Sequence, residues 1–498
     1  MFISLGTKIH NDAKPRLELL VKNSIASKIF SKDSSLWGPE AEQEASIRLG
    51  WTDPIDTAGE LVPQILKLRE ELNSAGVSRV VLCGMGGSSL APEVICKSEG
   101  AELFVLDSTS PTTVRNALQD LEKTVVVVSS KSGSTVETDS QKRIFEQEFQ
   151  KAGIDPSSRI IIVTDPGSPL MLDSQKKGYT IFEADPNVGG RYSALTAFGL
   201  VPSGIAGANI AKLVSEAKTS LPELSSDSSD NPAMVLAASI SGERSRLLID
   251  DRISTHKGFA DWAEQLIAES TGKEGKGILP VAGDHSAEIV NKTRDILPVN
   301  FSTSEAEDDF VNISGSLGEL FMVFETATAA AGWLLGINPF DQPDVESAKK
   351  AARESLDSSP DQSLGEIQSA KELISNIPTH GYLSVQLYAN RQDTPNVERL
   401  RKKLVEISKV PVTIGWGPRF LHSTGQFHKG GKPGGAFLQI VQRDQELEIP
   451  GKDFGFQKLI EAQAAGDAKV LSDKGNAVVR LEIEQGVDVI EFLEQIVG

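Results

Sequence analysis

Short, continuous apolar runs alternate with helical stretches along the chain, and this alternation limits the folds that the chain can adopt. In the first half, the runs lie at residues 80–83, 124–128 and 159–164, with helical periodicity between them. A strand that is apolar on both faces is typical of a parallel sheet covered by helices on both sides. Similar runs return at 382–388 and 436–442. The sequence therefore predicts an α/β protein with parallel sheets.

Chain length and polar breaks suggest how the elements are divided. A length of 498 residues fits two to four domains of roughly 150 residues each. The polar stretches SSDSSDNP and RESLDSSPDQS are typical of surface connections. We expect an N-terminal helical segment at 1–55, a first α/β domain at 56–204, a second at 205–355 and a C-terminal α/β region at 356–498.

The charge of the chain restricts its partners. Lys and Arg number 50 and Asp and Glu number 69, so the formal net charge is −19. A chain this acidic is a poor general binder of nucleic acid or of an anionic membrane. If its ligand is an anion, positive charge must be gathered locally around that ligand.

Cysteine content and hydropathy favour a cytoplasmic location. Cys83 and Cys96 are the only cysteines, too few for a disulfide framework, which favours a reducing compartment. The strongest apolar run, at 317–337, contains Glu319 and Glu325, so we expect a buried core helix there and not a membrane span. The N-terminus lacks a long apolar region with a small-residue cleavage site, so we expect no signal peptide.

Two polar turns directly follow predicted strands. GMGGSS at 84–89 has glycines that allow a ligand to approach the backbone, and SSKSGST at 129–135 combines hydroxyl groups with Lys131. Because the carboxyl ends of parallel strands meet at one edge of a sheet, we expect the two turns to lie together and bind a phosphate group. Each turn alone also fits a tight strand-to-helix connection with an N-cap residue.

Two further segments carry groups suited to acid–base chemistry. Arg191 follows two glycines, where it can stabilise developing negative charge, although the pattern also fits a surface arginine after a turn. Glu269 lies in the last turn of an amphipathic helix that ends at Gly272, where the helix dipole disfavours a carboxylate. One interpretation is a general base, and the other is a solvated glutamate at a helix end.

The histidines show no metal-ligand spacing, so we expect no catalytic metal. His422 and His428 lie in a glycine-dense stretch, GWGPRFLHSTGQFHKGGKPGG, at the end of a predicted strand. Either of them fits a functional role or a structural one.

Five segments resemble, in chain order, the motifs of the glucose-6-phosphate isomerase (phosphoglucose isomerase) family. GMGGSSLAP resembles its GIGGSxLGP loop, SSKSGSTVET its SKTxxTxET phosphate loop, and GGRYSALTAFGL its GGRxSxxSAxGL signature. ESTGK resembles the ESNGK segment with the catalytic glutamate, and NPFDQPDVESAKK resembles FDQxGVExxK. The terminal segments LWGPEAEQEASIRLGW and GPRFLHSTGQFHKGG are most similar to the isomerase half of fused transaldolase–phosphoglucose isomerase proteins.

The resemblance implies two doubly wound sugar-isomerase (SIS) domains and reversible isomerisation of D-glucose 6-phosphate and D-fructose 6-phosphate, with no metal or organic cofactor. It also implies a homodimer that acts on a small sugar phosphate, with no nucleic-acid or membrane partner. In the catalytic set, Arg191 would stabilise an enediolate, Glu269 would move a proton between C2 and C1, and Lys349 would match the motif lysine. The implied substrate-binding residues are Ser88, Ser130, Lys131, Ser132, Thr135, Glu137 and Gln342.

The family's ring-opening histidine lies between the glutamate and FDQ motifs, an interval that here contains only His285. His422, in FLHSTGQ, is more similar to the LAHTDG histidine of shorter bacterial members, and we expect it to open the ring. Neighbours such as Gln426 would orient its imidazole. His428 is a weaker candidate, because Lys429 beside it would lower its pKa.

Two alternative functions remain open at this point. The same base could serve either epimer at C2, which would give a dual phosphoglucose/phosphomannose isomerase. A non-catalytic sugar-phosphate sensor would need the phosphate loop alone. The retained set of Arg191, Glu269 and Lys349 favours an enzyme.

Overall fold

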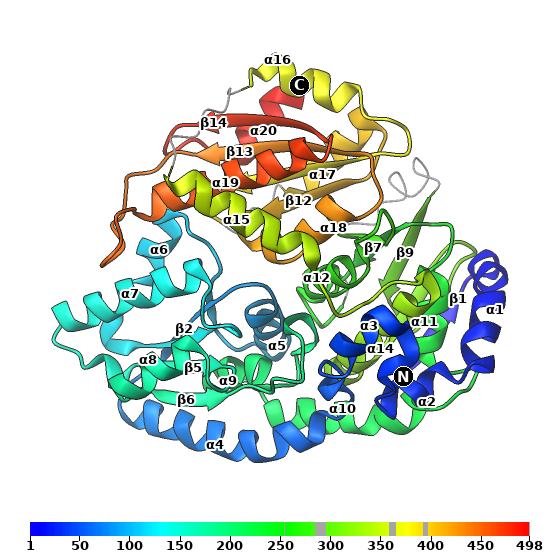
Figure 1. The fold of residues 1–498 in the computed structure, drawn as a ribbon, viewed down its shortest axis with the longest axis horizontal. Coiled ribbons are helices and arrows are strands. Elements are labelled where there is room, and N and C mark those ends of the chain that lie inside the picture. The colour runs from blue at the N-terminus through cyan, green and yellow to red at the C-terminus, as the bar shows by residue number, and fades with distance from the viewer. Residues whose placement is uncertain (253, 284–294, 358–364, 392–396, 498) are drawn as a thin grey trace.

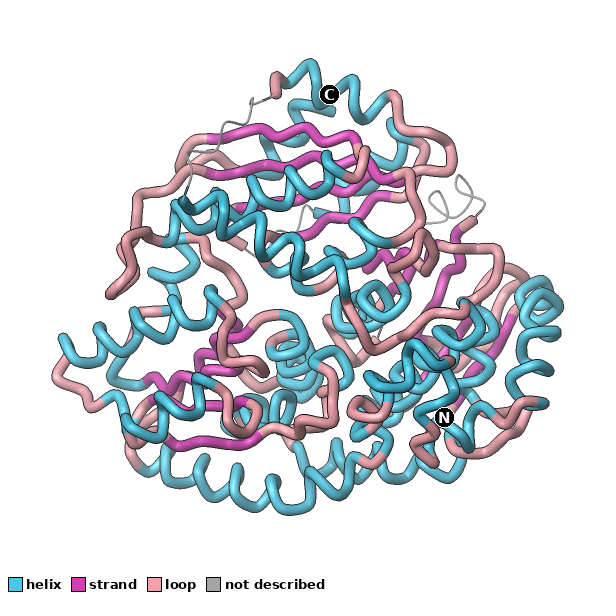
Figure 2. The backbone as a smooth tube through the Cα atoms, in the orientation of Figure 1, coloured by secondary structure: helices cyan, strands magenta, loops and turns pink. Residues whose placement is uncertain are grey.

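Three sheets of mainly parallel strands organise the part of the chain that the structure describes (Figure 1). This computed structural model describes residues 1–252, 254–283, 295–357, 365–391 and 397–497. Each sheet and its helices form one lobe, which we call the first, second and C-terminal lobes in chain order. Figure 2 shows three groups of strands with helices around each of them. The prediction of an α/β fold with parallel sheets is confirmed.

The first lobe is built on the strands that the apolar runs predicted. β2 (Arg79–Gly84), β4 (Thr124–Ser129) and β5 (Ile160–Thr164) pair in parallel in the middle of the sheet. β3 (Phe104–Leu106) and β6 (Thr180–Glu183) form its two edges.

Successive residues of β4 enter different hydrophobic cores, because strand side chains alternate between the two faces of a sheet. Val127 belongs to a core cluster with residues of α9 (Ala197–Ala206), whereas Val128 belongs to one with residues of α7 (Val136–Lys151). Helices therefore cover both faces of this sheet, as expected for a doubly wound domain.

The second lobe contains a mixed sheet with the order β1-β10-β9-β7-β8. β7 (Arg246–Asp250), β8 (Leu279–Ala282), β9 (Ile296–Phe301) and β10 (Val311–Ser314) are parallel to one another. β1 (Phe2–Leu5) is antiparallel to β10 at the edge.

The sequence predicted a helical segment at the N-terminus, and the structure adds a strand to it. Helices α1 (Thr7–Lys22) and α3 (Pro39–Ala45) are present, but β1 precedes them. A strand of four residues has almost no periodicity to detect. Its hydrogen-bond partner comes from a distant part of the chain, with Phe2 opposite Ser314.

The apolar run at 317–337 forms α14 (Leu317–Leu335), a core helix as expected. Glu325 lies on it with 1% of its surface exposed, and burial raises the pKa of this carboxyl well above its usual range. Among the described residues, no helix has the length and apolar character needed to cross a membrane.

The C-terminal lobe has four parallel strands in the order β12-β11-β13-β14. They are β11 (Tyr382–Tyr388), β12 (Val412–Trp416), β13 (Gly435–Gln442) and β14 (Ala477–Ile483). Because β12 and β13 lie on opposite sides of β11, the strand order reverses there, and such reversals leave a crevice at the carboxyl ends of the strands. The short turn η7 (Arg419–His422) follows β12 at this end.

Two helices pack closely on each other beside the C-terminal sheet. α15 (Pro343–Asp357) runs beside α19 (Phe456–Asp473) in Figure 1. A Cβ atom at Gly466 would lie 2.5 Å from the backbone nitrogen of Ala352, so the close approach of the helices requires a glycine there.

Candidate active site

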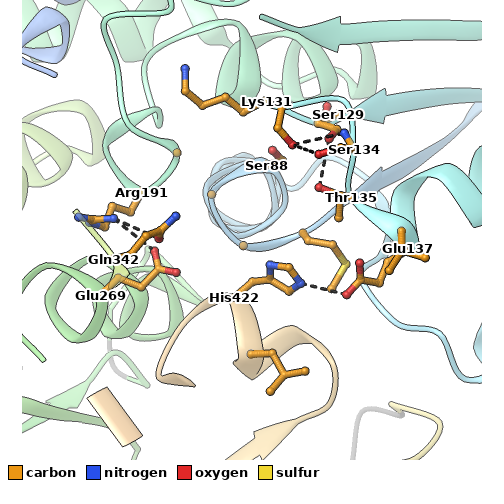
Figure 3. Close-up of a pocket in the computed structure, with 18 of the residues that line it drawn as sticks. Ser88, Ser129, Lys131, Ser134, Thr135, Glu137, Arg191, Glu269, Gln342 and His422 are labelled. Atoms are coloured by element: carbon orange, nitrogen blue, oxygen red, sulfur yellow. Dashed lines mark hydrogen bonds and ion pairs between the residues drawn. The ribbon is translucent and has the colours of Figure 1, made fainter. Parts of the chain in front are cut away.

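A cavity of about 900 Å³ is lined by residues of all three lobes. Figure 3 shows its lining, with the serine-rich turn on one side, Arg191 and Glu269 on another, and His422 facing Glu137. Of the residues predicted from the sequence, the cavity lining includes Ser88, Ser130, Lys131, Ser132, Thr135, Glu137, Arg191, Glu269, Gln342 and His422.

The glycine turn after β2 packs directly on the turn that carries Arg191. A Cβ atom at Gly87 would lie 2.0 Å from the carbonyl oxygen of Gly190, so backbone meets backbone with no room for a side chain. This contact brings Ser88 and Arg191 to the same cavity. The two segments that looked separate in the sequence are therefore one structural unit.

The serine-rich turn leads from β4 into α7. The Ser130 hydroxyl donates to Oγ1 of Thr135 at 3.2 Å, and the hydroxyls of Ser132 and Ser134 lie 2.9 Å apart. Thr135 is the N-cap residue of α7, so the free amides of the first helical turn lie beside these hydroxyls. Hydroxyl groups and helix amides together form an environment suited to a phosphate group.

Lys131 lines the cavity, but its ammonium group is paired with a carboxylate. Its Nζ lies 2.8 Å from Oδ2 of Asp165, which follows β5. Burial raises the pKa of Asp165, while Lys131 opposes that rise. The positive charge expected for the phosphate site is thus partly offset by Asp165, a neighbour that the sequence did not indicate.

Arg191 is buried, with its guanidinium group held on several sides. Nε donates to Oγ of Ser270 at 2.8 Å, and Nη2 donates to the carbonyl oxygen of Pro339 at 2.7 Å. Nη1 lies 3.4 Å from Oε1 of Gln342 and 3.9 Å from Oε2 of Glu269. The surface-arginine interpretation is wrong, because only 4% of Arg191 is exposed.

Glu269 lies in the last turn of α12 (Phe259–Thr271) and is 5% exposed, so the solvated helix-end interpretation is also wrong. Gln265, one turn earlier, donates from Nε2 to Oε2 of Glu269 at 3.2 Å. A buried carboxylate beside a guanidinium at the wall of a cavity can accept and return a proton.

Lys273 is a further charged residue beside this pair. Its Nζ donates to the carbonyl oxygens of Asn338 and Asp341, each at 2.7 Å. Burial, followed by the positive charge of Arg191, lowers the pKa of Lys273 to about 8. It is the lysine of the ESTGK segment, so the motif contained the signal for it.

His422 ends the η7 turn and enters the cavity from the C-terminal lobe. Its Nε2 atom lies 3.0 Å from Oε1 of Glu137 in the first turn of α7. Gln265 donates to the backbone carbonyl of His422 at 2.7 Å, which ties this turn to the helix of Glu269. The structure thus brings together the histidine and the phosphate-loop glutamate that the sequence singled out.

The expected orientation of His422 by Gln426 is wrong. The Gln426 amide instead donates to the carbonyl oxygen of Gly272 at 3.0 Å and to Oδ2 of Asp344 at 2.9 Å. Gln426 is on α18 (Gly425–Gly430), which packs on the end of the helix of Glu269. The imidazole is oriented by Glu137, a contact between lobes that no local pattern predicts.

His428 packs inside the C-terminal lobe and does not line the cavity. It lies on α18 and is buried, with Nδ1 3.0 Å from the hydroxyl of Tyr382 on β11. Burial, followed by the charge of Lys429, lowers the pKa of His428 to about 3, in the predicted direction. His285 lies outside the described residues, as does the side chain of Lys349, whose position falls within α15.

Several residues of the cavity carried no signal in the sequence. Gln265 and Gln463 come from helices whose patterns show amphipathic packing and nothing more, and Arg48 lies in the turn after α3. Over the described ranges, no group of three or more His, Cys, Asp and Glu side chains has the arrangement of a metal site.

The fold and the cavity define an α/β protein whose lobes bring a carboxylate, a guanidinium and an imidazole together beside a hydroxyl-rich turn. The family model of phosphoglucose isomerase matches residues 69–241. The probable glucose-6-phosphate isomerase of Methanococcus maripaludis is 30% identical over 354 residues, which cover 57% of this chain and 81% of the relative. The glucose-6-phosphate isomerase of Clostridium tetani is 30% identical over 385 residues, covering 61% and 85%.

The chain therefore belongs to the phosphoglucose isomerase family. Solved structures agree with the fold. A crystal structure of a glucose-6-phosphate isomerase from Chlamydia trachomatis has a TM-score of 0.54 at 19% identity, covering 70% of this chain and 85% of that one. A hypothetical protein from Thermus thermophilus has a TM-score of 0.61 at 23% identity, covering 72% and 100%.

Proposed function

We propose that this protein interconverts D-glucose 6-phosphate and D-fructose 6-phosphate through an enediolate intermediate. The observation that carries the proposal is the pair of facing acid–base sets in one cavity, Glu269 with Arg191 and His422 with Glu137 (Figure 3). A protein that only senses a sugar phosphate would have no need for two buried acid–base sets that face one cavity. Membership of the family supports the same reaction.

The phosphate group of the substrate would bind at the start of α7. The hydroxyls of Ser130, Ser132 and Thr135 offer donors there, with Ser88 from the neighbouring turn. Lys131 adds one positive charge, moderated by Asp165. Binding energy from the phosphate, remote from the reacting carbons, would hold C1 and C2 against Glu269.

His422 would open the sugar ring. The carboxylate of Glu137 is an acceptor and lies in the first turn of α7, where the helix dipole favours its charged form. In the neutral imidazole, the proton would then lie on Nε2 and Nδ1 would be the acceptor. A proton moved between O1 and O5 through this group converts the closed ring into the open chain.

Glu269 would then transfer a proton between the two carbons. Its carboxylate takes the proton from C2 of the aldose, and the electron pair of that bond forms the C1–C2 double bond of the enediolate. The guanidinium of Arg191, fixed by Ser270 and Pro339, stabilises the negative charge on oxygen. Return of the proton to C1, together with transfer of the hydroxyl proton from O2 to O1, gives the ketose. Gln342, which lines the cavity, would bind the sugar, and Lys349 would belong to the catalytic set as the lysine of the family motif.

Several finer points are part of this proposal. The chain would act in the cytoplasm as a homodimer, on the resemblance to its family, with residues 56–204 and 205–355 as its two SIS domains. Its closest type would be the isomerase half of fused transaldolase–phosphoglucose isomerase proteins. No observation here favours mannose 6-phosphate as a substrate.

The experiment that tests the proposal is a coupled assay on the purified full chain. Fructose 6-phosphate is supplied, and glucose 6-phosphate is detected with an NADP-dependent dehydrogenase. Turnover that disappears in Glu269→Gln supports the proposal. No glucose 6-phosphate from the wild-type chain would overturn it.

A further inference from the structure

Gln463 of the C-terminal lobe reaches across to the first lobe and joins the pair formed by His422 and Glu137. It lies on α19, and its Nε2 donates to Oε1 of Glu137 at 2.7 Å. Its own Oε1 accepts from the hydroxyl of Thr109 at 2.7 Å. Gln463 is 2% exposed and Thr109 is fully buried, so protein groups hold both ends of the amide.

The same oxygen of Glu137 receives both Gln463 and His422. The two donors lie 2.7 Å and 3.0 Å from Oε1. A carboxylate held by a second donor cannot rotate freely, so the direction in which it presents its lone pairs to His422 is fixed. Gln463 therefore acts on the imidazole through Glu137, without contacting the reacting atoms itself.

The orientation of the Gln463 amide is set by Thr109, which follows β3. Because the Thr109 hydroxyl donates to the amide oxygen, the amide nitrogen faces Glu137. The segment of Thr109 is itself held by α7, since Gln141 donates to the carbonyl oxygen of Ser108 at 3.0 Å. The amide thus has one orientation in this setting.

The same segment also supports the turn of His422. Arg419, which begins η7, donates from Nη1 to Oδ2 of Asp107 at 2.6 Å and to Oε2 of Glu93 at 2.7 Å. All three side chains are buried. Asp107 therefore fixes the turn that delivers His422, while Thr109, two residues later, fixes Gln463.

α19 is anchored one turn beyond Gln463. Asp467 forms an ion pair with Lys429 at 2.6 Å, with 0% and 1% of the two side chains exposed. A paired charge without access to water holds its partners in a narrow range of positions. The helix therefore presents Gln463 from a rigid support.

We propose that Gln463 is a positioning residue for ring opening, which holds Glu137 in the orientation that fixes the proton-accepting imidazole of His422. This inference rests on the proposed isomerase function. With Gln463, the C-terminal lobe would contribute a second residue to the site besides His422.

The test compares two ketose substrates. Fructose 6-phosphate must open its ring, whereas 5-deoxy-fructose 6-phosphate lacks O5 and carries its phosphate on O6, so it stays open. Exchange of the C1 proton in heavy water, followed by NMR, reports proton abstraction from either substrate. Gln463→Met removes the amide and keeps the length of the side chain. Gln457→Met is the matched control, because Gln457 is a buried glutamine of α19 that bonds to Gln442 and Glu461.

We expect Gln463→Met to lower kcat on fructose 6-phosphate by about tenfold, with KM changed less than about twofold. Its exchange rate with the 5-deoxy substrate should stay within about twofold of wild type, and Gln457→Met should match wild type on both. An equal loss on both substrates would show a general structural role and overturn the proposal. Unchanged turnover on fructose 6-phosphate would also overturn it.

A second measurement is independent of turnover. In Gln463→Met, Oε1 of Glu137 loses one of its two donors, so the NMR signals of the His422 imidazole should shift, while those of Gln457→Met should match wild type. Unmoved His422 signals in Gln463→Met would show that residue 463 does not act on the pair and would overturn the proposal. If the wild type proves inactive on fructose 6-phosphate, the proposed function fails, and this comparison of spectra still decides whether Gln463 acts on His422.

Discussion

Nε2 of His422 and Oε1 of Glu137 lie 3.0 Å apart, although 285 residues separate them in the chain. Glu137 begins the helix after the serine-rich turn, and His422 ends the turn after β12 in the C-terminal lobe. Two lobes must therefore be docked correctly before the imidazole is oriented. Both residues come from one chain, so this contact forms within a single subunit.

Replacing the buried carboxylate of α12 should stop the isomerisation. Glu269→Gln keeps the shape of the side chain and removes the base, so we expect turnover to fall about 10²-fold or more. Binding should survive, because the phosphate site is untouched. The coupled assay measures turnover, and competition by inorganic phosphate measures binding. Near-wild-type turnover would show that another group moves the proton.

Lys131 should matter for binding more than for chemistry. We expect Lys131→Ala to raise KM for fructose 6-phosphate and to weaken inhibition by inorganic phosphate, because the anion site loses its cation. Lys176→Ala, at an exposed position of α8 (Pro169–Lys177), is the matched control. If both variants behave like wild type, the phosphate binds elsewhere.

The ion pair of Lys131 gives a complementary prediction. Asp165→Asn removes the carboxylate that lies 2.8 Å from the ammonium group. With its partner gone, Lys131 can turn fully to the phosphate, so we expect KM for fructose 6-phosphate to stay equal or fall. A large rise in KM would mean that Asp165 is needed to hold the phosphate turn.

His428 should make the C-terminal lobe sensitive to acid. Its folded-state pKa is lowered to about 3, against about 6.5 when unfolded, so below pH 6.5 the unfolded chain takes up a proton that the folded chain does not. The free energy of unfolding then falls by about 1.4 kcal/mol for each pH unit, or about 2 kcal/mol at pH 5. Urea unfolding at pH 7.5 and pH 5 should show a smaller loss for His428→Gln. Equal losses would contradict this origin.

Chelators should leave the activity intact. The proposed proton transfers use the Glu269 carboxylate and the His422 imidazole, and no step needs a Lewis acid. Turnover before and after dialysis against EDTA is the measurement. Activity that disappears and returns with Zn²⁺ or Mn²⁺ would require a different mechanism.

The parallel sheets could be predicted from the sequence because each strand is a self-contained apolar run. β4 is an example, since its valines are apolar on both faces and the strand is buried throughout. The four residues of β1 could not be predicted, because their pairing with β10 depends on contacts from the far side of the lobe. Period and length identify an element, but they do not identify a distant partner.

Part of the site could likewise be predicted from local patterns, whereas another part depends on distant contacts. The serine-rich turn and Glu269 could be singled out, because a polar turn after a strand and a carboxylate at a helix C-terminus both break local rules. Gln463 could not be singled out from the sequence, because a glutamine in an amphipathic helix breaks no local rule. Its role comes from the docking of α19 against the first lobe, which places its amide 2.7 Å from Glu137.

The measurement that tests the central claim most directly compares His422→Ala with His285→Ala on fructose 6-phosphate and on 5-deoxy-fructose 6-phosphate. We expect His422→Ala to lose turnover with fructose 6-phosphate by about 10²-fold, while C1 proton exchange with the open-chain substrate continues near the wild-type rate. His285→Ala should resemble wild type on both substrates. A selective loss in His285→Ala, with His422→Ala unaffected, would contradict the assignment of His422 as the ring-opening residue.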